Sequence, residues 1–295
     1  MSITAAGSMI LTVNDVELWA EVQGKGLPLV LCHGGPGAYD YLAPLACMID
    51  DICTVIRYDQ RGNGRSTHTG PYDVQTHIND LDALRQRLNI TSWIVAGHSW
   101  GASLALAYSA RFPDRTLALI YVSGTGISPD WNRVYQQNCL AALNETDRKR
   151  FQQLYVRLAQ PQGEAYEQIK QELRMLYMKA DFADPDNIAK APLFNEYGIN
   201  SIANELVNVD WEFYMVRPEF LESLKRLSVP ALFLHGAQDP RSIVFAEELA
   251  SYVSTGEFIS ISETGHYPYI EQPEKTKTAL RSFIQEKIQI DNQSK

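Results

Sequence analysis

One serine lies where a chain could expose a nucleophile. Ser99 is the centre of GHSWG (97–101), which matches G-x-S-x-G. The apolar run 93–96 precedes this motif and an alanine-rich segment follows it, so we expect a strand-to-helix turn. Such a turn strains the backbone of the serine, and the flanking glycines remove Cβ atoms that would clash. The motif predicts Ser99 as a catalytic nucleophile; an ordinary glycine-rich turn is the alternative.

A serine hydroxyl attacks well only when a base takes its proton and a carboxylate orients that base. In hydrolases with this turn, the chain order is serine, acid, histidine. Asp239 follows the apolar run 229–236 and His266 follows the run 256–262, so both come just past the carboxyl ends of predicted strands. We predict Asp239 as the acid and His266 as the base. The alternatives are a turn aspartate before Pro240 and a loop histidine.

Other histidines are less suitable as bases. His33, His98 and His235 each lie beside a glycine or serine turn. His98 directly precedes the nucleophile, but we expect its side chain to point away from the Ser99 hydroxyl and to pack against neighbouring groups.

A glycine-rich segment, HGGPG (33–37), follows the apolar run 29–32. Backbone N–H groups fixed where negative charge develops stabilise a tetrahedral intermediate, each contributing about 2.7–4 kcal/mol. We predict an oxyanion hole formed by the N–H groups of Gly35 and of Trp100, the residue after the nucleophile. Pro36 has no N–H to offer. A simple turn is the alternative.

The candidate residues need a sheet to position them, and the sequence predicts its strands. Continuous apolar runs alternate with helix-length segments, which indicates a parallel sheet covered by helices on both faces. Residues 9–23 alternate apolar and polar side chains around Asn14-Asp15, which predicts an opening β-hairpin. The remaining predicted strands are 29–32, 52–58, 93–96, 117–122, 229–236 and 256–262.

The strand rhythm stops between residues 129 and 217. Apolar residues recur there at three- and four-residue spacing within long polar stretches, which is typical of amphipathic helices. We therefore predict the α/β-hydrolase fold, with residues 1–128 and 218–295 as the core and 129–217 as an inserted helical cap. A separate helical domain is the alternative.

Composition limits the possible partners. Twenty-six Lys and Arg against thirty-five Asp and Glu give a net charge of −9, with no basic run, so we expect no nucleic-acid partner. Neither a metal-ligand motif nor a phosphate- or dinucleotide-binding glycine motif occurs, so we expect no metal and no cofactor. With no visible signal peptide and no apolar run long enough to span a bilayer, we expect a cytoplasmic protein without a membrane partner. The oligomeric state stays open.

Four segments together resemble the proline iminopeptidase family of α/β-hydrolases. They are HGGPG (33–37), YDQRGNGRS (58–66), GHSWG (97–101) and GHYPYIEQPE (265–274). The resemblance covers the predicted core and implies the same triad and oxyanion donors as the residues above. It also implies a helical cap, and a structural role beneath the site for Asp59, Arg61 and Arg65.

The family implies removal of an N-terminal residue, often proline, from small peptides. A buried ammonium group needs carboxylates nearby. Glu205, in SIANELVNVDWEF, is the best match to the cap glutamates of the family, with Glu212 second; a solvated helical glutamate is the alternative for both. The sequence departs from the family at His98, where the peptidases often have glycine, and at Pro240, where some aminopeptidases carry another carboxylate.

These observations predict a serine hydrolase that acts through an acyl-enzyme on a small-molecule or short-peptide substrate. An aminopeptidase or related amide hydrolase is the leading hypothesis. A carboxylesterase or lactonase with the same triad is the first alternative, and a non-catalytic binding protein on the same fold is the second. A dehalogenase or epoxide hydrolase with an aspartate nucleophile is disfavoured, because Ser99 occupies the turn.

Overall fold

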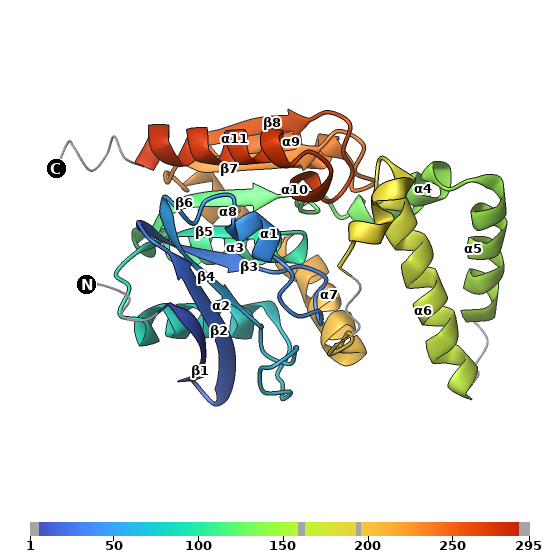
Figure 1. Ribbon diagram of the computed structural model, residues 1–295, viewed down its shortest axis with the longest axis horizontal. Helices are drawn as coiled ribbons and strands as arrows, with labels where there is room; N and C mark the ends of the chain where they lie inside the picture. Colours follow the sequence, from blue (N-terminus) through green and yellow to red (C-terminus); the bar gives the residue numbers. More distant parts are fainter. Residues whose placement is uncertain (1–5, 159–162, 193–195, 289–295) are drawn as a thin grey trace.

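The computed structural model describes residues 6–158, 163–192 and 196–288, and its strands form one eight-stranded sheet (Figure 1). The strands are β1 (Gly7–Val13), β2 (Val16–Gly24), β3 (Leu27–Cys32), β4 (Cys53–Tyr58), β5 (Trp93–His98), β6 (Thr116–Val122), β7 (Ala231–Gly236) and β8 (Gly256–Ile261). Their order across the sheet is β1-β2-β4-β3-β5-β6-β7-β8. The sheet confirms the predicted fold class.

The hairpin predicted at the start of the chain is present. Strands β1 and β2 are antiparallel, with Val13 opposite Val16, and Asn14 adopts a left-handed φ of 48° that asparagine tolerates in turns. Strand β2 is also antiparallel to β4, and all other pairs are parallel. The central strands β5 and β7 are buried along their whole length, which explains their continuous apolar sequences.

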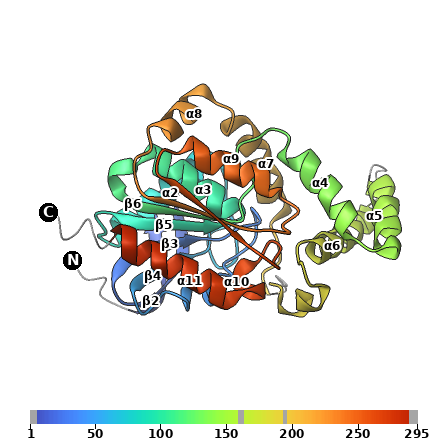
Figure 2. The same cartoon turned by 90° about the horizontal axis from the view of Figure 1, so that it is seen from above.

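Helices cover both faces of the sheet (Figure 2). On one face, buried side chains of α2 (Val74–Arg87), α3 (Trp100–Arg111), α8 (Pro218–Lys225) and α9 (Ile243–Tyr252) form one apolar cluster with the strands. On the other face, α1 (Ala43–Ala46), α10 (Pro268–Glu271) and α11 (Pro273–Phe283) contribute to a second cluster. The sheet therefore lies between two packed layers of helices.

The inserted region forms a third cluster of its own. Helices α4 (Trp131–Ala142), α5 (Glu145–Leu158) and α6 (Gly163–Ala180) project from the core, and η2 (Pro185–Lys190) follows them (Figure 1). Cys139, Leu154 and Leu173 are buried together, one from each of the three helices. This confirms an inserted helical region around residues 131–190.

The last helix of the predicted cap packs differently. In α7 (Ser201–Tyr214), Val207 and Trp211 are buried in the cluster that the sheet forms with α2 and α3. Helix α7 thus lies between the projecting helices and the core. The exact cap limits, 129–217, stay a prediction. Across the described ranges, no helix combines the length and apolar character that crossing a bilayer requires.

Candidate active site

Ser99 occupies the turn between β5 and α3. Its backbone angles, φ 58° and ψ −126°, lie where a residue with a side chain is strained. Both flanking glycines are needed by close packing. A Cβ on Gly97 would lie 2.0 Å from the Gly101 carbonyl oxygen, and a Cβ on Gly101 would lie 1.9 Å from the Cys32 carbonyl oxygen. The sequence therefore folds into a turn that presents Ser99 at the head of a helix.

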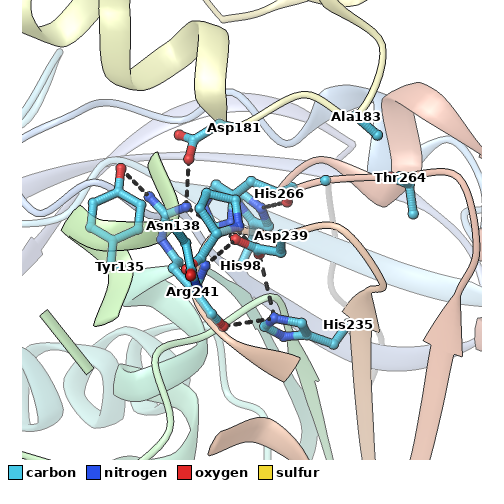
Figure 3. Close-up of polar contacts among 12 residues, drawn as sticks. His98, Tyr135, Asn138, Asp181, Ala183, His235, Asp239, Arg241, Thr264 and His266 are labelled. Atoms are coloured by element: carbon cyan, nitrogen blue, oxygen red, sulfur yellow. Dashed lines mark hydrogen bonds and ion pairs between the residues drawn. The ribbon is translucent and has the colours of Figure 1, made fainter. Parts of the chain in front are cut away.

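His266 and Asp239 meet across two loops at the same edge of the sheet. His266 lies between β8 and α10, Asp239 lies between β7 and α9, and His266 Nδ1 is 2.8 Å from Asp239 Oδ2 (Figure 3). Because the carboxylate can only accept, Nδ1 carries the proton and Nε2 is left to act as a base.

The hydrogen bonds of the described residues do not include one between Ser99 and His266. Their loops are nevertheless adjacent, because the ring centroid of His98, the residue before Ser99, lies 4.5 Å from that of His266. In free enzymes, the bond between nucleophile and base is often loose and tightens with substrate.

The surroundings of Asp239 favour its ionised form. Burial opposes ionisation, but the neighbouring His266, His235 and Arg241 outweigh it and hold the pKa of this carboxyl well below its usual range. The Arg241 main-chain N–H also donates to Asp239 Oδ1 at 2.9 Å. Asp239 is thus a fixed negative charge that keeps the imidazole oriented.

The loop that carries one predicted oxyanion donor, Gly35, touches Ser99, and the other donor, Trp100, directly follows it. A Cβ on Gly34 would lie 2.6 Å from Ser99 Cβ, so the glycine-rich loop touches the serine directly. Gly35 adopts a left-handed φ of 56°, and Trp100 provides the first N–H of α3. In the described part of the chain, neither N–H donates to a protein group. Both are available to a substrate oxygen, which is what the predicted role requires.

A partly buried polar chain, which sequence reasoning missed, joins the glycine-rich loop to the predicted base, His266. The Gly34 N–H donates to Tyr41 Oη (3.0 Å), this hydroxyl lies 2.7 Å from His98 Nδ1, and His98 Nε2 lies 2.8 Å from the carbonyl oxygen of His266. These partners assign the proton to Nε2 and make Nδ1 the acceptor. Burial lowers the pKa of His98 well below its usual value, so the ring is neutral. The sequence predicted only packing for this histidine.

A second missed feature connects the end of α6 to the loops that carry Asp239 and His266. Asp181, directly after α6, accepts from Arg241 Nη1 at 2.7 Å, and its main-chain oxygen accepts from the His266 N–H at 2.7 Å (Figure 3). The Arg241 guanidinium also lies 4.4 Å from the ring centroid of Tyr135 in α4. No spacing motif could reveal these contacts, because Asp181 and Arg241 are 60 residues apart.

The residues assigned a structural role by resemblance make protein contacts. Asp59 accepts from the side chain of Arg65 at 2.7 and 2.9 Å, and Arg61 donates to Asp80 at 2.7 and 2.9 Å. None of Asp59, Arg61 and Arg65 lines the cavity over Ser99. These contacts fit the role of holding the loop.

A cavity of about 550 Å³ lies over Ser99, between the core and the inserted helices. Its aromatic lining is Trp100, Trp131, Tyr135, Tyr155, Tyr166, Tyr177, Trp211 and Tyr267. Its charged lining is Lys170, Arg174, Asp181, Glu205 and Arg241. Gly35 also borders it, whereas Glu212 does not. In the part of the chain that is described, no three His, Cys, Asp or Glu side chains gather as metal ligands would.

Buried neutral histidines predict acid sensitivity. Burial lowers the pKa of His33 to about 4 and also lowers those of His98 and His235. The unfolded chain binds these protons near pH 6.5, about the ordinary histidine value, and the folded chain does not. The free energy of unfolding should therefore fall by roughly 1 kcal/mol per pH unit for each such histidine as the pH drops below that value.

Urea unfolding at several pH values between about 7 and about 5 measures this slope. His33→Gln should flatten the slope, while the same change at the exposed His68 should leave it intact. A free energy of unfolding that is constant over this range would contradict the expectation.

The fold and the strained turn at Ser99 together define a class of hydrolases. Residues 28–273 match the family model described as alpha/beta hydrolase fold, and the chain belongs to that family. The match runs from β3 to the start of α11 and includes the inserted helices.

Proline iminopeptidases are relatives over most of the chain, which confirms the resemblance. The proline iminopeptidase of Xylella fastidiosa (strain 9a5c) is 30% identical over 266 residues, 78% of this chain and 80% of that protein. The match to the Arabidopsis thaliana enzyme is 39% identical but covers 37% of this chain and only 30% of that protein.

Solved structures of proteins with different named activities show the same fold. The proline iminopeptidase of Mycobacterium smegmatis has a TM-score of 0.72 at 22% identity and covers 97% of this chain and 100% of its own. A thermophilic esterase from Thermogutta terrifontis has a TM-score of 0.69 at 25% identity, covering 95% and 99%.

Proposed function

We propose that this protein is a serine hydrolase that acts through an acyl-enzyme as an aminopeptidase on short peptides. The observation that supports it most is the 2.8 Å contact of His266 Nδ1 with Asp239 Oδ2, beside the strained turn of Ser99. The relatives named proline iminopeptidase favour an amide bond at the N-terminal end of a peptide as the target.

The reaction follows from these groups. Ser99 Oγ attacks the carbonyl carbon while His266 Nε2 takes its proton, and the N–H groups of Gly35 and Trp100 bind the resulting oxyanion. Collapse of this intermediate breaks the C–N bond, and the leaving amine takes the proton from His266. Water then attacks the acyl-enzyme ester with the same base and releases the acid. Asp239 stays ionised throughout and fixes the imidazole tautomer.

The ammonium group of such a substrate needs a carboxylate in the cavity. Of the described lining residues, only Asp181 and Glu205 carry one, and Asp181 is already paired with Arg241 at 2.7 Å. Glu205 lies on α7, and none of the ion pairs among the described residues includes it. Glu205 therefore binds the substrate ammonium in this proposal.

Glu205→Gln is expected to raise KM for aminoacyl arylamides about fivefold to tenfold while sparing simple p-nitrophenyl esters. The loss is modest because Glu205 is exposed and solvent screens its charge. Steady-state kinetics on both substrate types measures the effect. Glu212→Gln is the matched control, since Glu212 is on the same helix but outside the cavity. An equal effect on amides and esters would refute the ammonium role of Glu205.

An esterase is the second candidate, because the Thermogutta terrifontis esterase shares the fold at 25% identity and the cavity has a largely aromatic lining. A panel of prolyl, alanyl and other aminoacyl arylamides beside short p-nitrophenyl esters separates the two. Turnover of arylamides supports the aminopeptidase. Turnover confined to esters would replace it with the esterase. A folded protein that a fluorophosphonate probe does not label would instead indicate a binding protein.

A further inference from the structure

One face of α6 lines the cavity with basic side chains. Lys170 and Arg174 are four residues apart, so they project from the same side of the helix, and Tyr177 continues this stripe towards Asp181. All four border the cavity over Ser99. The stripe therefore leads from the loop of the base, where Asp181 bonds His266, outward along the cap.

One cation of this stripe, Arg174, has no anionic partner among the described residues. The nearby carboxylate of Asp181 pairs with Arg241 instead. Arg174 is half-buried, and within the described ranges it makes no ion pair and no hydrogen bond. A partly desolvated guanidinium without an anion is unfavourable, so an anion arriving there is bound favourably.

We propose that Arg174, with Lys170 beside it, forms a subsite for the carboxylate at the C-terminus of a short peptide substrate. This subsite rests on the proposed aminopeptidase function and lies on the leaving-group side of the scissile bond. The ammonium end would be repelled by the Arg174 guanidinium and belongs instead at Glu205 on α7. The two ends of a zwitterionic peptide would thus contact different helices of the cavity wall.

The length of the preferred peptide follows from the helix. Asp181 lies at the level of the scissile bond along α6, because its carbonyl oxygen accepts a hydrogen bond from the His266 N–H. Arg174 is seven positions earlier, which is about 10 Å along the helix axis. An extended peptide spans about 3.3–3.6 Å per residue, so two or three residues beyond the scissile bond reach Arg174. Tripeptides and tetrapeptides are the substrates that fit.

The test compares one tetrapeptide with a free C-terminal carboxylate and the same peptide as its C-terminal amide. The scissile bond is identical, so only the terminal charge differs. The wild type should prefer the free acid about fivefold to tenfold in kcat/KM, mainly through KM, and added salt should reduce this preference. Arg174→Gln should bring the ratio close to one, and Arg174→Lys should keep part of it.

Arg157→Gln is the matched control. It removes one positive charge from the exposed surface of α5, outside the cavity, and should keep the full preference. Equal cleavage of acid and amide by the wild type would overturn the subsite while leaving the aminopeptidase intact.

A direct binding measurement separates failure of the subsite from failure of the proposed function. Calorimetry on Ser99→Ala, with and without Arg174→Gln, compares the two tetrapeptides without turnover. Tighter binding of the acid that Arg174→Gln abolishes supports the subsite, and equal binding of acid and amide overturns it. Failure of the wild type to cleave either peptide, beside rapid ester hydrolysis, would overturn the aminopeptidase, and the binding difference would still decide the subsite.

Discussion

Ser99→Ala is expected to lower kcat by about 10⁶-fold, because the substituted chain has no atom that can form the acyl-enzyme. Turnover of the best arylamide or ester measures this loss, and labelling with a fluorophosphonate probe should vanish in parallel. The turn itself should survive, since the strain at residue 99 belongs to the backbone and alanine adds no atoms to it.

Ser109→Ala is the matched control. Ser109 is buried in α3, the helix that directly follows Ser99, but it does not border the cavity. Turnover and labelling should therefore be retained. A Ser99→Ala protein that still turns over substrate at the wild-type rate would mean that another group is the nucleophile.

Asp239→Asn is expected to lower kcat by about 10⁴-fold with little change in KM. Asparagine has nearly the same shape, but its amide group can donate to His266 Nδ1 and so favours the tautomer with the proton on Nε2. That tautomer cannot accept the proton of Ser99. The carboxylate that the reaction needs is the favoured form, because the neighbours of Asp239, the Arg241 cation and the His266 hydrogen bond among them, outweigh its burial and hold its pKa well below the usual range.

Kinetics and thermal unfolding of the Asp239→Asn protein test this together. Arg241 keeps its contact with Asp181, so the fold should persist. Asp130→Asn removes an exposed carboxylate at the start of α4 and should leave kcat unchanged. A rise in KM at constant kcat would instead place Asp239 in substrate binding.

The features that sequence reasoning predicted correctly are those with a local signature. The strands follow from continuous apolar runs, because strands of a sheet covered on both faces are apolar throughout. The hairpin around Asn14 follows from alternation of apolar and polar residues. The candidate triad followed from the order in which Ser99, Asp239 and His266 leave the carboxyl ends of strands, and the structure places the last two in contact.

The features that it missed depend on packing between distant segments. Tyr41 and His98 are 57 residues apart and form a hydrogen bond only because the glycine-rich loop folds against the turn at Ser99. Helical periodicity could not separate Glu205 from Glu212 either, since both are exposed residues of α7. Only the position of α7 against the core decides that Glu205 borders the cavity.

Asp181 also limits how the inserted helices α4 to α6 can be exchanged between relatives. Its carbonyl oxygen contacts the loop of His266 and its carboxylate contacts Arg241 in the loop of Asp239, although the residue directly follows the inserted helix α6. A graft that replaced this position with an apolar residue would remove the shorter of the two ion pairs of the buried Arg241 guanidinium and leave only its 3.4 Å contact with Asp239. When helices α4 to α6 are exchanged between relatives, the exchanged segment should therefore end just before residue 181. The new helices can then change the cavity lining while Asp181 keeps its contacts with His266 and Arg241.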